Sequence, residues 1–388
     1  QNFINIGNDK VKSFFIPASF RSKYKRREYV ATGGYGSVFR LVGKIKKEVA
    51  VKKYITPFHT ATKAKRCFRE MQIIANIVHE NIVKMEMVYT TGKSIREMID
   101  VYLATKYGGE NLYMLLARET KAKHKFDLKS FKRMLSELLR AIKYINSLNV
   151  IHRDLKPDNL AIDNNGKLTL LDFGLSRVID SNNDMTSNPG QKYYRAIETI
   201  AFRQNASGAP INRKYNEKAD IWSIGAILCE MITGKILFKN YQVPTEQDFP
   251  LLNSIKFCGE IPRCVLEKVD NVNNRSYLHD KSRNIPRANF VQYFKKYGRS
   301  WLQKEIESNS VHLIDFINRT LAYDPDERMT VDEALAHPFL ASVRDRSKEV
   351  VADYSIRNFK DRSIEGWKRL IWHTIGASAS RRSTRKRK

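Results

Sequence analysis

The most distinctive candidate for chemistry is the stretch from His152 to Asn159, which reads HRDLKPDN. Its polar groups suit phosphoryl transfer, a reaction that needs precise positioning and positive charge around the transferred oxygens. Asp154 could accept or orient the proton of an attacking hydroxyl, Lys156 could steady the transferring phosphate, and Asn159 could hold Mg²⁺. An ordinary charged loop with a proline turn is the alternative, but eight residues in this order are too specific a match to favour it.

A second candidate, the triplet DFG at residues 172–174, follows an apolar run over residues 167–171 that predicts a strand. Asp172 could bind Mg²⁺ between the β- and γ-phosphates of ATP. Three residues alone are a weak signal. Their position thirteen residues after Asn159, in the order that this chemistry requires, makes the signal strong.

Towards the N-terminus, residues 31–38 read ATGGYGSV and are a candidate phosphate-binding loop. Glycines let backbone N–H groups approach a phosphate without a Cβ in the way. Taken alone, these glycines are equally typical of an ordinary hairpin turn. The residues of this loop that we expect to contact ATP are Ala31, Thr32, Gly33, Gly34, Tyr35, Gly36 and Val38.

The next predicted strand carries the run VAVK at residues 49–52, in which Ala50 and Lys52 are candidates for ATP binding. Lys52 could bind the α- and β-phosphates, although a lone lysine on a strand is usually a solvated surface residue. Glu70, on the helix predicted to follow, could pair with Lys52, although alone it would be assigned to the surface. The expected catalytic residues are Asp154, Lys156, Lys52 and Glu70, and the expected metal ligands are Asn159 and Asp172.

Hydrophobic patterning places these residues on secondary-structure elements. Residues 28–50 alternate between apolar and polar around the glycines, which predicts a strand-turn-strand hairpin. Apolar residues at helical spacing predict a helix over residues 61–79. Residues 100–105 form a short apolar strand, and residues 107–109 then break the pattern as a hinge would.

Beyond this hinge the patterning is mainly helical. Residues 128–148 predict a long amphipathic helix and residues 219–233 a strongly apolar, buried one. Another helix begins near residue 332, with Thr330 as its cap and Glu333 at the capping-box spacing. The chain is therefore predicted to be α+β, with a small strand-rich lobe followed by a large helical lobe.

Composition sets broad limits on function. The chain has 388 residues, 69 of them Lys or Arg and 41 Asp or Glu, which gives a formal net charge of +28. Such an excess attracts polyanions, but it is spread along the chain and dense only at residues 21–27 and 381–388. Four dispersed cysteines indicate neither a zinc site nor a disulfide framework. No apolar run approaches the roughly 20 residues that span a bilayer.

With these motifs in order, the chain resembles the protein kinases from about residue 24 to residue 375. Within them it resembles the mitogen-activated protein kinases, especially the stress-activated branch. The segments that carry this second resemblance are residues 152–160, 172–177, 185–186, 194–196, 220–225, 230–235 and 334–337, with an insert near 270–290 and a C-terminal extension that ends WKRL at 367–370.

The resemblance implies the bilobal protein kinase fold, with one regulatory helix in the small lobe. It divides the chain into five parts. They are an N-terminal extension at 1–23, the kinase N-lobe at 24–106, the kinase C-lobe at 107–340, a C-terminal extension packing on the N-lobe at 341–376, and a basic disordered tail at 377–388. That tail also resembles a nuclear-localisation run, a common and nonspecific pattern.

Further site residues follow from the resemblance alone. Thr105 is then the gatekeeper behind the adenine, and the backbone of Lys106, Tyr107 and Gly108 forms the hinge that binds the adenine edge. Glu198 is expected to pair with Arg328 and to anchor the end of the activation segment, which runs from Asp172 to Glu198. A buried pair of this kind is costly to break from one side.

The same resemblance makes Thr186 the regulatory phosphosite, with Arg66, Arg69 and Arg153 as the cluster that senses its phosphate. Phosphorylation would add a charge of about −2, order the loop and draw Glu70 toward Lys52. Thr186 as one of several ordinary loop hydroxyls is the alternative.

Several residues depart from the family pattern. Asn188, which cannot accept a phosphate, stands where the family has its second phosphosite. Gln191 stands where a threonine contacts the catalytic residues, and Ile197 stands where a proline is usual. These changes weaken the expectation of proline-directed specificity. Ala31 replaces the first glycine of the phosphate loop, which a negative φ would tolerate.

The acidic docking patch of the family is thinned. Asp345 and Glu349 remain, but Ser347 and Lys348 stand where acidic residues are expected. Binding of basic docking peptides is therefore expected to be weak. The other expected partners are protein substrates, an upstream kinase and phosphatases, with no membrane, no main role in nucleic-acid binding, and a monomeric state.

The function expected from all of this is Ser/Thr phosphorylation of proteins with ATP and Mg²⁺ as cofactors, in the cytoplasm and nucleus. One alternative is a catalytically weak kinase homologue that acts as a scaffold, supported by Ala31, Asn188 and Gln191. Another is binding to nucleic acid or an anionic surface, which only the net charge supports.

Overall fold

The computed structural model describes residues 2–34, 36–43, 47–119, 126–178, 192–199, 216–239, 249–267, 272–357 and 359–386. The chain forms two compact units. Unit 1 comprises Gln1–Gly108, Leu171–Leu175 and Phe359–Lys388, and unit 2 comprises Gly109–Leu170 and Ser176–Asn358. In the ranges given above, no helix has the length and apolar character needed to cross a membrane.

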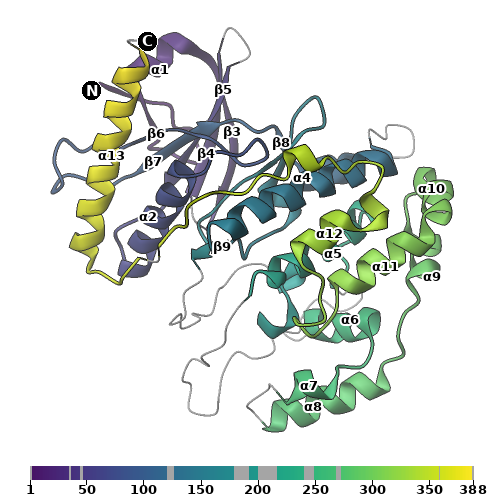
Figure 1. Ribbon diagram of the computed structural model, residues 1–388. Coiled ribbons are helices and arrows are strands. Elements are labelled where there is room, and N and C mark those ends of the chain that lie inside the picture. Colours follow the sequence, from purple (N-terminus) through teal and green to yellow (C-terminus); the bar gives the residue numbers. More distant parts are fainter. Residues whose placement is uncertain are drawn as a thin grey trace. The chain divides into compact units, whose positions relative to one another are not determined.

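Unit 1 is built on a five-stranded antiparallel sheet with the strand order β3-β4-β5-β7-β6 (Figure 1). The predicted hairpin is confirmed as β3 and β4, and β5 extends it. The predicted strand over residues 100–105 corresponds to β7. The bounds are Tyr24–Gly33 for β3, Gly36–Gly43 for β4, Glu48–Tyr54 for β5, Met85–Tyr89 for β6 and Tyr102–Lys106 for β7.

The two faces of this sheet differ because side chains alternate along a strand. One face is the core of unit 1, and its buried residues include Phe39, Leu41, Val49, Val51 and Ala104. The other face carries partly exposed side chains at the intervening positions. They are Val38 and Arg40 on β4, Ala50 and Lys52 on β5, and Thr105 on β7.

The first residues of the chain complete the core of unit 1. β1 (Phe3–Asn5) pairs with β2 (Phe15–Pro17), and α1 (Ala18–Lys23) follows directly. Phe14, Ile16 and Phe20 are buried against the sheet, with at most 1% of each exposed. The segment that was predicted as an N-terminal extension therefore packs as part of the sheet's hydrophobic core.

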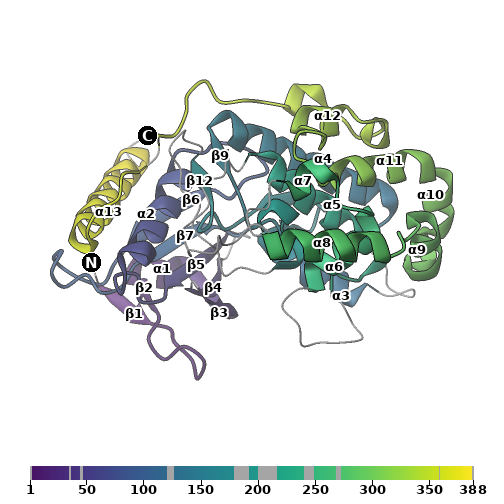
Figure 2. The ribbon, with the colours of Figure 1, turned by 90° about the horizontal axis from the view of Figure 1, so that it is seen from below.

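Two helices lie side by side in unit 1. Figures 1 and 2 both show α13 (Ile364–Lys386) alongside α2 (Ala61–Ala75), and α13 also packs on β6. The rings of Phe68 on α2 and Trp367 on α13 lie 5.4 Å apart, which joins the two helices. Thr60 caps α2, and the helix ends at Ala75, four residues before the predicted end.

The course of α13 corrects the prediction of a disordered tail at residues 377–388 as far as Lys386, where the helix ends, and residues 387–388 lie outside the described ranges. Ala and Arg, which recur after residue 376, have high helix propensities. These residues extend a helix whose earlier turns already pack on α2. Each added residue therefore gains a hydrogen bond without the cost of nucleating a new helix.

Unit 2 is mainly helical, and its two longest helices confirm the predictions. α4 (Leu128–Ser147) is capped by Asp127, and α5 (Lys218–Thr233) ends at Gly234, whose φ is +69°. The predicted capping box is present at α12 (Val331–Ala336). The other helices are α3 (Leu112–Arg118), α6 (Phe249–Cys258), α7 (Arg263–Leu266), α8 (Val272–Asn284), α9 (Phe290–Tyr297), α10 (Gln303–Ser308) and α11 (Ser310–Thr320).

Short strands and 3-10 turns complete unit 2. β8 (Glu110–Asn111), β10 (Leu160–Ile162) and β11 (Leu168–Leu170) form one small sheet, and β9 (Val150–Ile151) pairs with β12 (Arg177–Val178). The strand predicted over residues 167–171 is β11. The 3-10 turns are η1 (Pro157–Asn159), η2 (Lys192–Tyr194), η3 (Ile197–Thr199), η4 (Ser300–Leu302), η5 (Pro338–Leu340) and η6 (Arg346–Lys348).

The units divide the chain differently from the predicted lobes. The predicted boundary lies after residue 106, whereas the units divide after Gly108, and residues 341–358 belong to unit 2. Gly109 has a φ of +117°, and a Cβ built there would lie 2.1 Å from the carbonyl oxygen of Ile162. Only glycine fits this position, where the chain enters unit 2.

Candidate active site

Lys52 is the centre of a charged group in unit 1. Its Nζ lies 2.9 Å and 3.0 Å from the two carboxylate oxygens of Glu70 on α2. It also lies 3.2 Å from Oδ1 of Asp172. The predicted pairing of Lys52 with Glu70 is present, and one of the two predicted metal ligands joins it.

The charges of this group are held in a largely dry environment. Only 15% of the Lys52 side chain and 4% of the Glu70 side chain are exposed, against 32% for Asp172. Burial favours the neutral amine, but Asp172 and Glu70 outweigh it and hold the pKa of Lys52 above its usual range. Lys52 therefore stays protonated, and the more open carboxylate is the one that belongs to Asp172.

The backbone around Asp172 is unusual in a way that positions its carboxylate. Asp172 has a φ of +56°, a left-handed conformation that few residues other than glycine adopt. Its Oδ1 accepts a hydrogen bond of 3.1 Å from the Gly174 N–H, and Phe173 is fully buried. The turn thus holds one carboxylate oxygen toward Lys52, next to a phenyl ring that is fully buried.

The predicted ATP-binding residues lie at one end and on the open face of the sheet of unit 1. Ala31 sits in β3 opposite Val38, in extended backbone where alanine is tolerated, as expected. A Cβ built on Gly33 or Gly34 would meet no atom within 4 Å, so there is open space beside this turn. Gly36 has no such space, because its Cβ would lie 2.6 Å from the carbonyl oxygen of Lys53.

The predicted hinge continues from the sheet. Thr105 lies opposite Ala50 on the open face, and Lys106 is the last residue of β7. The N–H of Tyr107 donates to the carbonyl oxygen of Glu48 at 3.1 Å, so β5 holds this residue. Gly108 ends the first segment of unit 1.

The second charged group, in unit 2, is the loop that carries Asp154. Lys156 Nζ lies 2.9 Å from Oδ2 of Asp154, and the amide nitrogen of Asn159 donates to the same oxygen at 3.0 Å. The same nitrogen also donates to the backbone carbonyl of Asp154 at 2.7 Å. Because the nitrogen makes these bonds, the amide oxygen of Asn159 remains as the atom suited to a cation.

A buried carboxylate that the motifs did not single out fixes the backbone of this loop. Asp220, at the start of α5, accepts hydrogen bonds from the N–H groups of His152 at 2.8 Å and Arg153 at 2.9 Å. Asp220 is 1% exposed, and Arg153 has a left-handed φ of +69°. The sequence offered two signals that did not specify this role: the family resemblance of residues 220–225, and an acidic residue at the beginning of an apolar helix, which is also common as a helix cap.

The segment that ends at Glu198 is anchored in unit 2 as predicted. Arg328 is buried and donates to both carboxylate oxygens of Glu198, at 2.8 Å and 3.0 Å. A neighbouring anchor was not predicted. The hydroxyl of Tyr194 donates to Glu230 on α5 at 2.5 Å. Burial raises the pKa of Glu230 to about 7, although the bond from Tyr194 acts in the opposite direction.

Some predicted residues fall outside the ranges that the structure describes. They are Tyr35 of the phosphate loop, the phosphosite Thr186, and the altered positions Asn188 and Gln191. The arginines of the predicted phosphate-sensing cluster are described. Arg66 and Arg69 lie on α2 in unit 1, and Arg153 lies in the Asp154 loop of unit 2.

The residues present fit ATP and Mg²⁺. Taken by itself, unit 1 has a protonated lysine, the carboxylate of Asp172 and a glycine turn with open space beside it, groups that suit phosphates and a cation. Taken by itself, unit 2 has the amide oxygen of Asn159, which is also a donor suited to Mg²⁺. Mg²⁺ is commonly held by one or two protein side chains together with substrate phosphates and water. Among the described residues no cluster of three or more His, Cys, Asp or Glu forms a metal site, and this mode of binding needs none.

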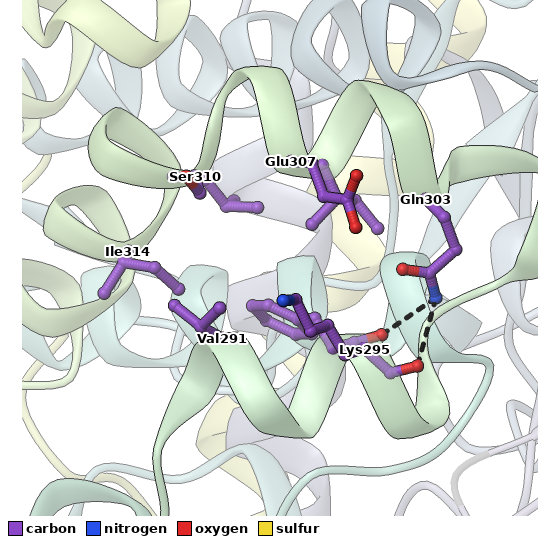
Figure 3. Close-up of a pocket in the computed structure, with 9 residues that line it drawn as sticks. Val291, Lys295, Gln303, Glu307, Ser310 and Ile314 are labelled. Atoms are coloured by element: carbon purple, nitrogen blue, oxygen red, sulfur yellow. Dashed lines mark hydrogen bonds between the residues drawn. The ribbon is translucent and has the colours of Figure 1, made fainter.

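A groove elsewhere in unit 2 contains none of the predicted residues. Figure 3 shows it between α9 and the segment of α10 and α11, with Lys295 and Glu307 at its rim. The amide of Gln303 donates to the carbonyl oxygens of Phe294 at 3.0 Å and Lys295 at 3.4 Å, so it caps the end of α9. We assign no part of the phosphoryl-transfer site to this groove.

Comparison with known proteins agrees with this geometry. Residues 24–340 match the protein kinase domain. Mitogen-activated protein kinase 12 of Mus musculus is 31% identical over 358 residues, which cover 92% of this chain and 89% of the relative. Mitogen-activated protein kinase 13 of Homo sapiens is 32% identical over 357 residues, covering 91% of this chain and 88% of the relative.

The chain belongs to the mitogen-activated protein kinase family. The predicted resemblance to its stress-activated branch is confirmed, as is the predicted kinase fold. This kinase is an ATP-dependent serine/threonine protein kinase of mitogen-activated type. Members of the family use ATP with Mg²⁺, modify protein substrates and are themselves acted on by upstream kinases.

Proposed function

We propose that this kinase is catalytically active and that it transfers the γ-phosphate of Mg·ATP with the residues predicted from the sequence. The observation that carries the proposal is the contact of Lys52 with both Glu70 and Asp172. The carboxylates of a helix glutamate and of the DFG aspartate both lie within hydrogen-bond distance of the ammonium group of a strand lysine. A scaffold with no phosphoryl transfer has no need of this arrangement.

In this proposal Lys52 binds the α- and β-phosphates, and Glu70 keeps its ammonium group in place. Asp154 accepts or orients the proton of the substrate hydroxyl. Its Oδ2 already accepts bonds from Lys156 and Asn159, so we assign the proton to Oδ1. Lys156 then steadies the phosphate as charge develops on its oxygens.

Asn159 and Asp172 hold Mg²⁺, which supplies the positive charge that offsets the phosphate oxygens when it is bound. Asp172 contributes the more exposed carboxylate of its group, and Asn159 contributes its amide oxygen. The positive φ of Asp172 supports this role, because backbone strain of this kind concentrates at functional sites.

Control by phosphorylation of Thr186 belongs to the proposal. Its phosphate would gather Arg66, Arg69 and Arg153, and it would stabilise the contact of Glu70 with Lys52 through α2. Because Asn188 replaces the second phosphosite, modification of Thr186, alone or with Ser187, is expected to suffice. Proline-directed specificity remains part of the proposal on the family resemblance alone.

Weak recruitment of basic docking peptides is also proposed, and contacts around η6 support it. Glu349 accepts from Arg344 at 2.7 Å and lies 3.3 Å from Lys143 Nζ, with 7% of its side chain exposed. Asp345 accepts from the N–H of Ser347 at 3.1 Å and lies 3.7 Å from Lys348 Nζ. Glu349 is thus buried against cations of the chain itself, whereas Asp345 is 44% exposed and shares its charge with Lys348. One of the two remaining carboxylates is therefore withdrawn from a basic peptide.

Cellular context completes the proposal. We propose a monomer in the cytoplasm and nucleus, with protein substrates, an upstream kinase and phosphatases as partners. The four cysteines support a reducing compartment, since all are free thiols in the structure. The basic run at residues 381–388 supports nuclear entry.

The test is transfer of the γ-phosphate to a generic protein substrate by the wild type, Asp172→Ala and Lys52→Met. The expected result is transfer by the wild type and a loss of about 10³-fold in both variants. Lys53→Met is the matched control, because Lys53 is adjacent on β5 but contacts the carbonyl of Ser13 instead. Mass spectrometry first establishes that Thr186 is phosphorylated in each protein. Equal and negligible transfer by all four phosphorylated proteins would then favour the scaffold.

A further inference from the structure

Arg40 occupies a central position on the open face of the sheet in unit 1. Within the sheet it lies directly opposite Glu28 on β3 and Ala50 on β5. Because side chains alternate along a strand, it shares its face with Val38 and Lys52, the predicted ATP-binding residues. No sequence motif marks Arg40, and the proposed mechanism does not use it.

The guanidinium group of Arg40 joins three strands. Its Nη1 donates to Glu28 at 3.0 Å, and its Nη2 and Nε donate to the two carboxylate oxygens of Glu48 at 2.7 Å and 3.2 Å. The bond to Glu48 is therefore bidentate, the strongest form of this pair. About 25% of the Arg40 and Glu48 side chains is exposed, so solvent screens the cluster only in part.

The same group also contacts the predicted hinge. The Cζ of Arg40 lies 4.5 Å from the centroid of the Tyr107 ring, within the range of a cation–π interaction. Glu48 holds the other side of this residue, because its carbonyl oxygen accepts the Tyr107 N–H at 3.1 Å. The side chain and the backbone of Tyr107 are thus both fixed by one Arg40–Glu48 pair.

We propose that Arg40 is a positioning residue for the hinge, and that it sets the affinity of the kinase for the adenosine part of ATP through Tyr107. The inference rests on the proposed nucleotide site. A planar guanidinium is required, because it must stack on a ring and fork onto a carboxylate at once, which a lysine ammonium cannot do. Arg40 itself need not touch the nucleotide.

The experiment compares dissociation constants of Mg·ATP and of adenosine, measured by calorimetry, for the wild type, Arg40→Met and Arg40→Lys. Losing a partly exposed cation–π contact and its forked bond is expected to weaken both ligands about 5-fold to 10-fold in Arg40→Met. Arg40→Lys is expected to recover part of this loss. Arg26→Met is the matched control, because Arg26 also pairs with Glu28 but has 69% of its side chain exposed.

A readout without nucleotide accompanies the binding measurement. In Arg40→Met the amide of Tyr107 is expected to exchange its hydrogen faster than in the wild type, while amides of α4 keep their wild-type rates. In a double-mutant cycle, Tyr107→Phe keeps the ring and should leave the Arg40→Met effect intact, whereas Tyr107→Ala should abolish it.

The outcomes separate this inference from the proposed function. If the wild type binds no Mg·ATP, the proposed nucleotide site is wrong and the inference falls with it. If the wild type binds Mg·ATP and Arg40→Met binds both ligands as tightly as the wild type does, the inference alone is overturned. A loss for Mg·ATP without a loss for adenosine also overturns it, because Arg40 would then act on the phosphate loop and not on the hinge.

Discussion

The charged group of unit 1 and the charged group of unit 2 are held in different ways. In unit 1, Lys52, Glu70 and Asp172 meet through their side chains alone, from segments as much as 120 residues apart. In unit 2, the loop of Asp154 is fixed by its backbone, because the buried carboxylate of Asp220 accepts two of its N–H groups.

This difference suggests a division of roles. A group of charged side chains from separate segments can form or come apart when a charge is added nearby, which suits regulation by phosphorylation. A loop whose buried backbone donors are satisfied inside the fold cannot change without leaving polar groups unpaired. We therefore expect changes in unit 1 to affect activity more than stability, and changes at the anchors of unit 2 to affect stability first.

The net charge follows the same division. Unit 1 has 31 Lys and Arg against 11 Asp and Glu, a net +20, whereas unit 2 has 38 against 30, a net +8. The two dense basic runs noted in the sequence, residues 21–27 and 381–388, both belong to unit 1 and account for most of this difference. Unit 1 carries most of the field that would attract the phosphates of a nucleotide.

The largest effect is expected at Arg328. Arg328→Met leaves Glu198 and three backbone carbonyls of unit 2 without this donor, so the free energy of unfolding should fall by about 3–5 kcal/mol. Denaturant unfolding measures it. Arg263→Met is the control, since its pair with Glu267 is largely exposed and should change stability by less than about 0.5 kcal/mol. A fall as small as the control's would remove the contrast between the units.

The second effect is a pH dependence in unit 2. The pKa of Glu230 is raised by burial to about 7, from an ordinary 4.5, so the folded state binds a proton that the unfolded state has lost between these pH values. The free energy of unfolding should therefore fall as pH rises from 4.5 to 7, by up to about 3 kcal/mol from this residue. Glu230→Gln should lose that part of the slope, and an unchanged slope would show that Glu230 titrates normally.

A third effect sharpens the comparison from the side of unit 1. In Glu70→Gln, Lys52 keeps Asp172 as a partner but loses its anchor on α2, so kcat should fall about 10²-fold, equivalent to about 2.7 kcal/mol. The free energy of unfolding should change by about 1 kcal/mol. Transfer assays and denaturant unfolding on the same protein measure both. A loss of stability that exceeded the loss of activity would reverse the proposed division.

The smallest effect is expected far from either charged group. Thr330→Ala removes one half of the capping box of α12, which should cost about 1 kcal/mol of stability and leave kcat unchanged. Thr330→Ser retains the hydroxyl and should keep most of that stability. A fall in kcat would mean that stability and activity are not separable in unit 2.

Much of the site was predictable because its residues can be recognised from their types and their order in the sequence. Glu70 was predicted to pair with Lys52 and Asp172 to bind the metal, and the structure brings these three together. The capping box at Thr330 and Glu333 was predicted because capping is decided within four residues. Local chemistry of this kind can be inferred from local sequence.

What could not be predicted depends on contacts between distant segments. Asp220 lies more than sixty residues from the backbone that it holds, and although residues 220–225 carry part of the family resemblance, no local pattern shows which N–H groups Asp220 binds. Tyr107 was predicted as a hinge residue, but Arg40 is unremarkable in the sequence, and only the register of the strands brings its guanidinium group to the Tyr107 ring. The end of α13 was misjudged because polar composition was weighed above helix propensity and packing on α2.

The most direct measurement is calorimetric binding of ATP to the unmodified kinase and to Asp172→Asn, with and without Mg²⁺. If ammonium and metal-holding side chains serve one nucleotide, the wild type should bind ATP more tightly when Mg²⁺ is present, and Asp172→Asn should lose that gain. Uptake of ATP that is indifferent to Mg²⁺ in both proteins, or no uptake at all, would contradict the assignment of this chain as an active phosphoryl-transfer enzyme.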